Sequence, residues 1–194
     1  GAFDPERNIL VVPVSQVPFY VRLIPADQVD KTKARDPRAG NPMGPPGLIK
    51  GTDYGLEQKA VLSPLFSPCT APPWSLMVAV DMISGDILWK TPFGKIDELS
   101  PLPIGFEWGT PFAGGAITTA GGVVFIGATA DERFRAFDIS TGKKLLEIKA
   151  PTSAMASPMT YMANGKQYVV IATGGHMWNY PKGISDEIIA YALP

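Results

Sequence analysis

The chain has 194 residues and a formal net charge of −1, enough sequence for one domain with a real core. This charge gives no electrostatic basis for binding nucleic acid or an anionic membrane surface. The 20 glycines and 20 prolines favour many short strands and long loops, the single Cys69 excludes an intrachain disulfide, and no apolar run is long enough to span a bilayer.

The N-terminal residues already read as part of a strand-bearing unit. A turn at Asp4–Asn8 precedes the apolar run Ile9–Val12. Two similar apolar runs, each also preceded by a turn, lie at Val123–Ala128 and Tyr168–Ala172. Continuous Val and Ile bounded by Gly and Asn predict strands covered on both faces. Because the chain opens within such a unit, we interpret it as a fragment of a longer protein.

A long stretch rich in Pro, Gly and charge, residues 24–74, separates the first run from its continuation. The basic residues near 31–38 read as a solvated surface. Loops of this length inside a compact domain are uncommon, and they are either functional or disordered. Both alternatives stay open, and no helix is predicted here or elsewhere.

A short motif occurs twice, 57 residues apart. Residues 77–89 align with 134–146, so that Asp81 falls on Asp138, Gly85 on Gly142 and Trp89 on Leu146. A strand ending in Asp, a turn containing Gly and a second strand describe a β-hairpin, and repetition at this period is typical of propellers. We expect the two Asp to accept backbone N–H bonds in their turns and Trp89 to serve packing.

The repeat divides the chain into blade units. We predict units at about 1–92 (containing the 24–74 insertion), 115–150 and 151–194, all within one propeller fragment. The stretch 131–134 reads as a turn between strands. Aromatic residues lie near the start of the second unit, at Phe106, Trp108 and Phe112. We expect at least two of these three to fill gaps between blades.

Common catalytic signatures are absent from the sequence. It contains no phosphate-binding loop, no paired-histidine zinc motif and no nucleophile elbow. The one histidine, His176, follows an apolar run and two glycines. At the mouth of a propeller its imidazole could exchange a proton with a ligand, and glycines allow the backbone to approach a planar group. The alternative is a loop histidine beside aromatic residues 177–180.

Several stretches together resemble one family. The motif from Ala79 to Trp89 resembles the tryptophan-docking repeat of eight-bladed quinoprotein dehydrogenases. Further stretches narrow the resemblance to the C-terminal part of the membrane-bound enzymes that use pyrroloquinoline quinone (PQQ) to oxidise glucose, quinate or shikimate: 18–25, 40–43, 63–74, 114–131, 164–176 and 189–194.

The resemblance implies an all-β fold, a partial β-propeller formed by the last blades. In the longer protein it implies a membrane anchor, a site for PQQ with Ca²⁺ or Mg²⁺ on the propeller axis, oxidation of a polyol and electron transfer to ubiquinone at the periplasmic face of the inner membrane. The fragment itself is expected to be soluble and inactive. Its exposed blade edges could pair with the rest of the propeller or with a second copy.

The resemblance also supplies candidate cofactor-binding residues. Gly175 and His176 match the family's Gly-Gly-His at the cofactor edge. Phe112 and Ala113 fall where alcohol-oxidising relatives carry Trp-Asn, so Phe replaces the stacking Trp. Pro13 falls where glucose-oxidising members carry Asn, which removes a side-chain donor and disfavours glucose as substrate. Neither the catalytic Asp nor the metal ligands are expected in this chain.

Three alternatives remain at this point. The longer protein could be a PQQ-dependent glucose dehydrogenase instead of a quinate/shikimate dehydrogenase. The chain could also belong to a non-catalytic propeller scaffold of the outer-membrane-assembly lipoprotein type, against which the long insertion and the Gly-Gly-His end argue. A carbohydrate- or peptide-binding module using the aromatic residues near 106–112 is the third.

Overall fold

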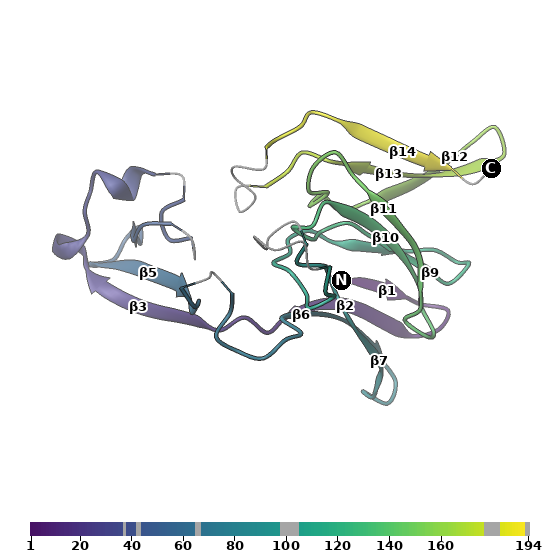
Figure 1. The fold of residues 1–194 in the computed structure, drawn as a ribbon, viewed down its shortest axis with the longest axis horizontal. Coiled ribbons are helices and arrows are strands. Elements are labelled where there is room, and N and C mark those ends of the chain that lie inside the picture. The colour runs from purple at the N-terminus through teal and green to yellow at the C-terminus, as the bar shows by residue number, and fades with distance from the viewer. Residues whose placement is uncertain (37, 42–43, 65–66, 98–104, 177–182, 193–194) are drawn as a thin grey trace. The chain divides into compact units, whose positions relative to one another are not determined.

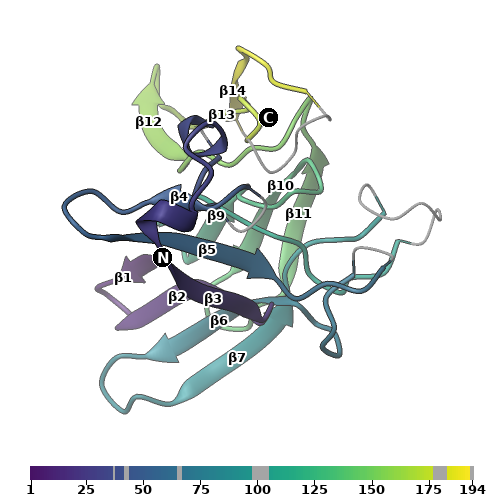
Figure 2. The same ribbon diagram turned by 90° about the vertical axis from the view of Figure 1, so that its left-hand side faces the viewer.

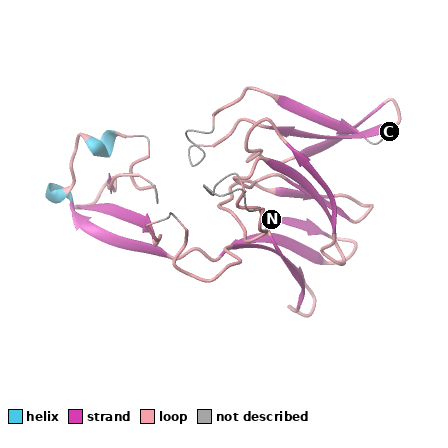
Figure 3. Cartoon of the chain, in the orientation of Figure 1, coloured by secondary structure: helices cyan, strands magenta, loops and turns pink. Residues whose placement is uncertain are grey.

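The computed structural model describes residues 1–36, 38–41, 44–64, 67–97, 105–176 and 183–192. It divides the chain into two compact units, one formed by residues 1–16 and 72–194 and the other by residues 17–71. Strands dominate, and the described helices are two single 3-10 turns (Figure 3). The all-β class is therefore confirmed.

The larger unit contains three antiparallel sheets that stack on one another (Figure 1). The first has the order β1-β2-β6-β7, the second β11-β10-β9-β8 and the third β12-β13-β14. In the described residues the sheets do not close into a ring. Their bounds are β1 Ala2–Asp4, β2 Ile9–Ser15, β6 Ser75–Asp81, β7 Ile87–Pro92, β8 Ala116–Thr118, β9 Val123–Ile126, β10 Arg133–Asp138, β11 Lys144–Lys149, β12 Met159–Ala163, β13 Lys166–Ala172 and β14 Ile188–Ala192.

Burial follows strand position in each sheet. The central strands β6 and β10 are mostly buried, whereas the edge strands β7 and β11 are mostly exposed. Strand β6 pairs with β2 on one side and with β7 on the other. The Val- and Ile-rich runs form β2, β9 and β13, which are each paired on both sides, and their apolar residues alternate between buried and half-buried.

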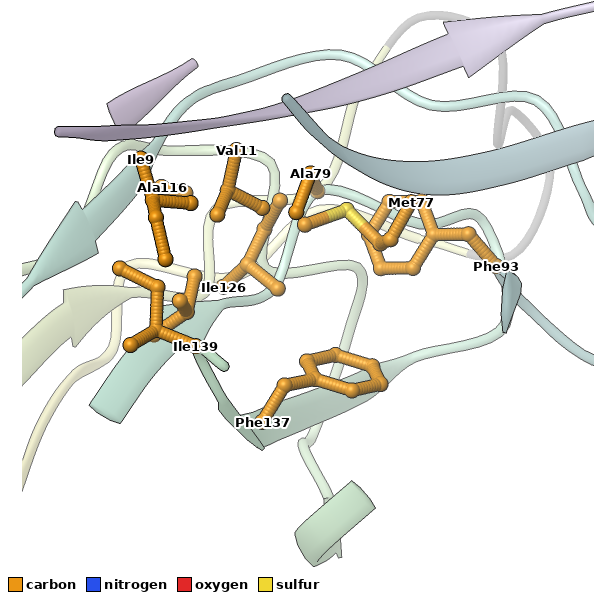
Figure 4. Packing of buried hydrophobic residues seen from close by; sticks show 11 residues of the cluster. Ile9, Val11, Met77, Ala79, Phe93, Ala116, Ile126, Phe137 and Ile139 are labelled. Carbon is orange, nitrogen blue, oxygen red and sulfur yellow. The ribbon is translucent and has the colours of Figure 1, made fainter. Parts of the chain in front are cut away.

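Two apolar clusters hold the three sheets together. The first joins the first and second sheets, with Met77 and Ala79 facing Ile126 and Phe137 (Figure 4). The second joins the second and third sheets through residues such as Phe134 and Ile171. The second sheet therefore buries both faces, and the first and third sheets each bury one face against it, as stacked propeller blades do.

The smaller unit differs from the loop alternatives considered for residues 24–74. It forms its own antiparallel sheet in the order β3-β5-β4, with β3 at Phe19–Pro25, β4 at Gly47–Leu48 and β5 at Tyr54–Ala60 (Figure 2). The single turns η1 and η2 lie at Ala26–Gln28 and Lys33–Arg35. The sequence of β5 has few β-branched residues, so its strand is set by pairing with β3 and not by local propensity.

Candidate functional site

Gly175 and His176 follow β13 at the end of the third sheet. The Gly175 amide donates to the Ser153 carbonyl (3.1 Å), and the Gly175 backbone has a φ of +75°. A Cβ at Gly175 would lie 2.7 Å from the Gly183 carbonyl oxygen. This glycine is therefore required by its own chain, because a side chain would collide with the returning segment. His176 is half-buried, and the aromatic residues 177–180 lie outside the described residues.

Phe112 and Ala113 lie on the connection that leads into the second sheet. Phe112 forms an isolated β-bridge with Thr129, and the Ala113 amide donates to the Ala128 carbonyl (2.9 Å). The Phe112 ring packs on Phe93 with a centroid distance of 6.0 Å. Phe112 is thus half-buried against the first core cluster.

A continuous series of backbone contacts joins these two pairs. The Ala128 amide donates to the Ala154 carbonyl (2.7 Å), and Ala154 directly follows Ser153, whose carbonyl accepts from Gly175. Gly114 approaches the Met155 carbonyl so closely that a Cβ would not fit. One hydrogen-bonded assembly therefore contains three of the five candidates, Phe112, Ala113 and Gly175, and His176 directly follows Gly175 in the chain.

Pro13 is not part of this assembly. It lies in β2 opposite Met77 and is half-buried. No described contact links it to the other four residues. That Pro13 lies close to a cofactor stays a prediction.

The aromatic residues near 106–112 differ from the expectation that two of three fill gaps between blades. Phe106 is 48% exposed and Trp108 37% exposed, and their rings stack at 4.7 Å. Trp74 meets Trp108 edge-on at 5.8 Å. Of the three, only Phe112 packs against the first core cluster. The expectation was wrong because Phe106 and Trp108 satisfy their packing with each other instead of with a neighbouring sheet.

A buried ion pair adjoins Thr129, the bridge partner of Phe112, and was not predicted from the sequence. Asp131 is fully buried and Arg135 is 2% exposed, and their side chains form an ion pair. Arg135 also donates to the Thr129 hydroxyl (2.8 Å) and to the Glu147 carboxylate (3.1 Å). The signal was a charged residue between Phe134 and Phe137 in a buried strand, where an unpaired charge would be too costly.

Surrounding charges extend this pair into a network. The Lys95 amide donates to Asp131 (2.7 Å), and the Lys95 ammonium pairs with Glu147. Burial alone would raise the pKa of Glu147, but hydrogen bonds from Lys144 and Lys95 and the charge of Arg135 lower that pKa to about 2. Burial alone would lower the pKa of Arg135, yet its bonds to Asp131 and the charges of Asp131 and Glu147 raise it. Both groups are therefore charged at neutral pH.

The two repeat aspartates have the structural role expected of them. Asp81 accepts the amides of Ile83 (2.7 Å) and Ser84 (3.1 Å). Asp138 accepts the amides of Ser140 (3.0 Å) and Thr141 (2.8 Å). This expectation is confirmed.

Comparison with known proteins identifies the family. The family model for PQQ, described as glucose/ethanol/alcohol dehydrogenase, beta-propeller domain, matches residues 1–169. The chain belongs to the PQQ-dependent dehydrogenase β-propeller family. This membership confirms the resemblance and the partial-propeller interpretation of the stacked sheets.

The relatives include enzymes that are named for different substrates. The chain is 42% identical to quinoprotein glucose dehydrogenase A of Acinetobacter calcoaceticus, over 98% of the chain and 24% of the relative. It is 36% identical to a probable quinate dehydrogenase (quinone) of Xanthomonas campestris pv. juglandis, over 98% of the chain and 25% of the relative. The chain thus spans about a quarter of the length of these relatives.

A solved structure agrees with the fold. The quinohemoprotein alcohol dehydrogenase of Comamonas testosteroni superimposes with a TM-score of 0.54 and 29% identity, over 89% of this chain and 21% of that one. Among the described residues of our chain, no group of three or more potential ligands could hold a metal ion. In the same residues, no helix has the length and apolarity needed to cross a membrane.

The chemistry of the assembled residues is compatible with one edge of a planar cofactor. They offer the half-buried ring of Phe112, glycine backbone without a side chain and the imidazole of His176. None of the five candidates is a lysine or an arginine, so the carboxylates of PQQ would need such partners from elsewhere in a longer protein. The fit therefore concerns an edge of the cofactor and not a complete pocket.

Proposed function

We propose that this chain is the C-terminal propeller segment of a PQQ-dependent dehydrogenase that oxidises quinate or shikimate and passes electrons to ubiquinone. The observation that supports this function is the assembly of Phe112, Ala113, Gly175 and His176 at neighbouring strand ends, in a chain of the PQQ family. Membership of that family also argues against the non-catalytic scaffold.

The roles of this chain's residues follow from their chemistry. The imidazole of His176 can donate or accept one hydrogen bond at the cofactor edge. Phe112 offers an apolar ring surface, held in place by Phe93 beneath it. Gly175 allows the backbone to lie close to a bound cofactor, in a position fixed by the hydrogen bond from its amide to the Ser153 carbonyl.

The cofactor supplies the redox chemistry when it is bound, as PQQ accepts two electrons from an alcohol with a divalent cation polarising its carbonyl. In this proposal, the rest of the longer protein provides the Ca²⁺ or Mg²⁺ ligands and the catalytic base. The isolated chain is therefore expected to be inactive. The longer protein would act at the periplasmic face of the inner membrane.

Glucose is the second candidate substrate. The 42% identity to a glucose dehydrogenase favours it. Pro13 argues against glucose, because glucose-oxidising members carry Asn at this position and a proline offers no side-chain hydrogen bond there. Both substrate classes are polyols, so one assay can compare them.

The edges of the sheets indicate where further chain would pair. In the described residues, β14 pairs with β13 on one side and with no strand on the other. We propose that this edge is covered by the rest of the propeller, or by a second copy when the fragment is alone.

The function is tested by dye-linked oxidation with the longer protein that contains this chain, reconstituted with PQQ and Ca²⁺ or Mg²⁺. Quinate, shikimate and glucose are compared, each with wild type and His176→Ala. We expect PQQ-dependent activity with quinate or shikimate that falls in the variant. Activity with glucose alone would replace the substrate assignment, and no PQQ-dependent activity with any of them would reject the proposed function.

A further inference from the structure

Two series of contacts connect Arg135 to the candidate cofactor edge. This edge consists of Phe112, Ala113, Gly175 and His176. The first series runs through Thr129, whose hydroxyl accepts from Arg135 (2.8 Å) and donates to Asp131 (2.6 Å). Thr129 also forms the β-bridge to Phe112. The second series runs through Phe93, because the Arg135 guanidinium lies 5.9 Å from the centre of the Phe93 ring, on which Phe112 packs.

The segment above this ion pair has an unusual backbone. Ala128 has a φ of +63° and Glu132 a φ of +59°, although neither is a glycine and both are buried. Such conformations cost free energy and persist only where the surroundings determine them. Asp131 and Thr129, which lie between these two residues, are both bound to Arg135. The ion pair thus holds the strained segment in place.

The strained segment in turn carries the hydrogen bonds of the edge. The Ala128 carbonyl accepts from Ala113, and the Ala128 amide donates to Ala154, next to the Ser153 that binds Gly175. Displacement of residues 128–132 would therefore move both halves of the edge. No other described cation contacts both Thr129 and Asp131 through its side chain.

We propose that Arg135 is a positioning residue for the cofactor edge. It does not touch the cofactor. It fixes residues 128–132 and Phe93 so that Phe112, Ala113 and Gly175 keep one geometry. This inference rests on the proposed function for the identity of the ligand, whereas its structural part concerns this chain alone.

The structural part is tested by amide hydrogen exchange on the chain. Three variants are compared: Arg135→Met, the double variant Asp131→Asn with Arg135→Met, and Lys144→Met as matched control. The double variant leaves no unpaired buried charge, which protects the test if the single variant fails to fold. Lys144 belongs to the same charge network but contacts Glu107 and Glu147, not residues 128–132.

We expect the amides of Ala113 and Gly175 to exchange at least about tenfold faster in the double variant, while that of Val78 in the first sheet stays within about twofold of wild type. Lys144→Met should leave all three unchanged. If Val78 accelerates to the same degree, Arg135 is merely structural. If Ala113 and Gly175 keep wild-type exchange, the positioning role is wrong.

The functional part is tested by PQQ affinity of the longer protein in its apo form. With wild-type binding established, the double variant should bind PQQ at least about tenfold more weakly, and Lys144→Met as wild type. Equal affinity in the double variant would overturn the positioning of the cofactor edge and leave the proposed function intact. Failure of the wild type to bind PQQ would instead reject the proposed function, while the exchange experiment still decides the structural part.

Discussion

The indole of Trp89 lies directly over the backbone of Gly142 and donates its N–H to the Ile139 carbonyl (2.8 Å). Trp89 belongs to the first sheet, and Gly142 and Ile139 to the turn of the second. The two copies of the sequence repeat therefore interlock, with the end of one hairpin bound to the turn of the next. The packing role expected for Trp89 is confirmed.

Replacement of Gly142 by Ala tests this contact. A Cβ would lie 2.5 Å from the Trp89 ring, at a φ of +70° that favours glycine. We expect Gly142→Ala to destabilise the chain by about 2–4 kcal/mol in denaturant unfolding.

The matched control is Gly85→Ala at the same position of the first repeat. Gly85 has a φ of +81°, and nothing lies within 4 Å of its added Cβ. Gly85→Ala should lose only about 1 kcal/mol, the cost of placing a residue with a Cβ at a positive φ. Equal losses at the two glycines would contradict a role for docking.

Trp89→Phe separates the hydrogen bond from the packing. Phenylalanine retains an aromatic ring against the first core cluster but leaves the Ile139 carbonyl without its indole donor. We expect a loss of about 1–2 kcal/mol in the free energy of unfolding. A loss below a few tenths would mean that water replaces the donor at no cost.

The hydrogen bonds of Asp138 in its turn are expected to stabilise the chain. Its carboxylate accepts the amides of Ser140 and Thr141 and the Thr141 hydroxyl (2.8 Å). Asp138→Ala should destabilise the chain by about 1 kcal/mol, and Asp138→Asn by less, because an amide oxygen can still accept these bonds. Denaturant unfolding checks this. The midpoint concentration should be lowest for Asp138→Ala, intermediate for Asp138→Asn and highest for the wild type.

The lowered pKa of Glu147 predicts that the folded chain loses stability at acid pH. Its pKa is lowered from 4.5 to about 2 in the folded chain, so the folded state favours the carboxylate. Its contribution to stability is fully present above pH 4.5 and is lost as the pH falls toward 2. We expect wild type to lose roughly 2 kcal/mol more than Glu147→Gln over this window, given that Lys95 and Lys144 are partly solvated. Parallel pH profiles of the two proteins would show that Glu147 is not the group responsible.

The sequence predicted the repeated parts of the fold better than the rest. The Asp-turn-Gly hairpin and the apolar runs correspond to β6–β7, β10–β11 and the central strands, because local turn chemistry and burial act together there. The sheet of residues 17–71 was missed because its two long strands lack the local signals of a core strand. Strand β5 contains no β-branched residue, and β3 is apolar in sequence but mostly exposed, so neither shows a buried Val- and Ile-rich run.

The candidate site shows the same division. Gly175 and Phe112 could be nominated from motifs, but the reason for Gly175 is the close approach of Gly183, which no local pattern reveals. The Arg135–Asp131 pair was visible only as a charge within a buried strand. The connection of this pair to Phe112 depends on the β-bridge between Thr129 and Phe112, which forms only in the folded chain.

The most direct test of a PQQ-propeller segment is equilibrium binding of PQQ to the apo form of the longer protein, to the same protein with His176→Ala, and to the 194-residue chain alone. We predict saturable binding by the longer protein, at least about tenfold weaker binding by the variant and none by the isolated chain. Unchanged PQQ affinity in the His176→Ala protein would contradict the placement of the cofactor edge at His176.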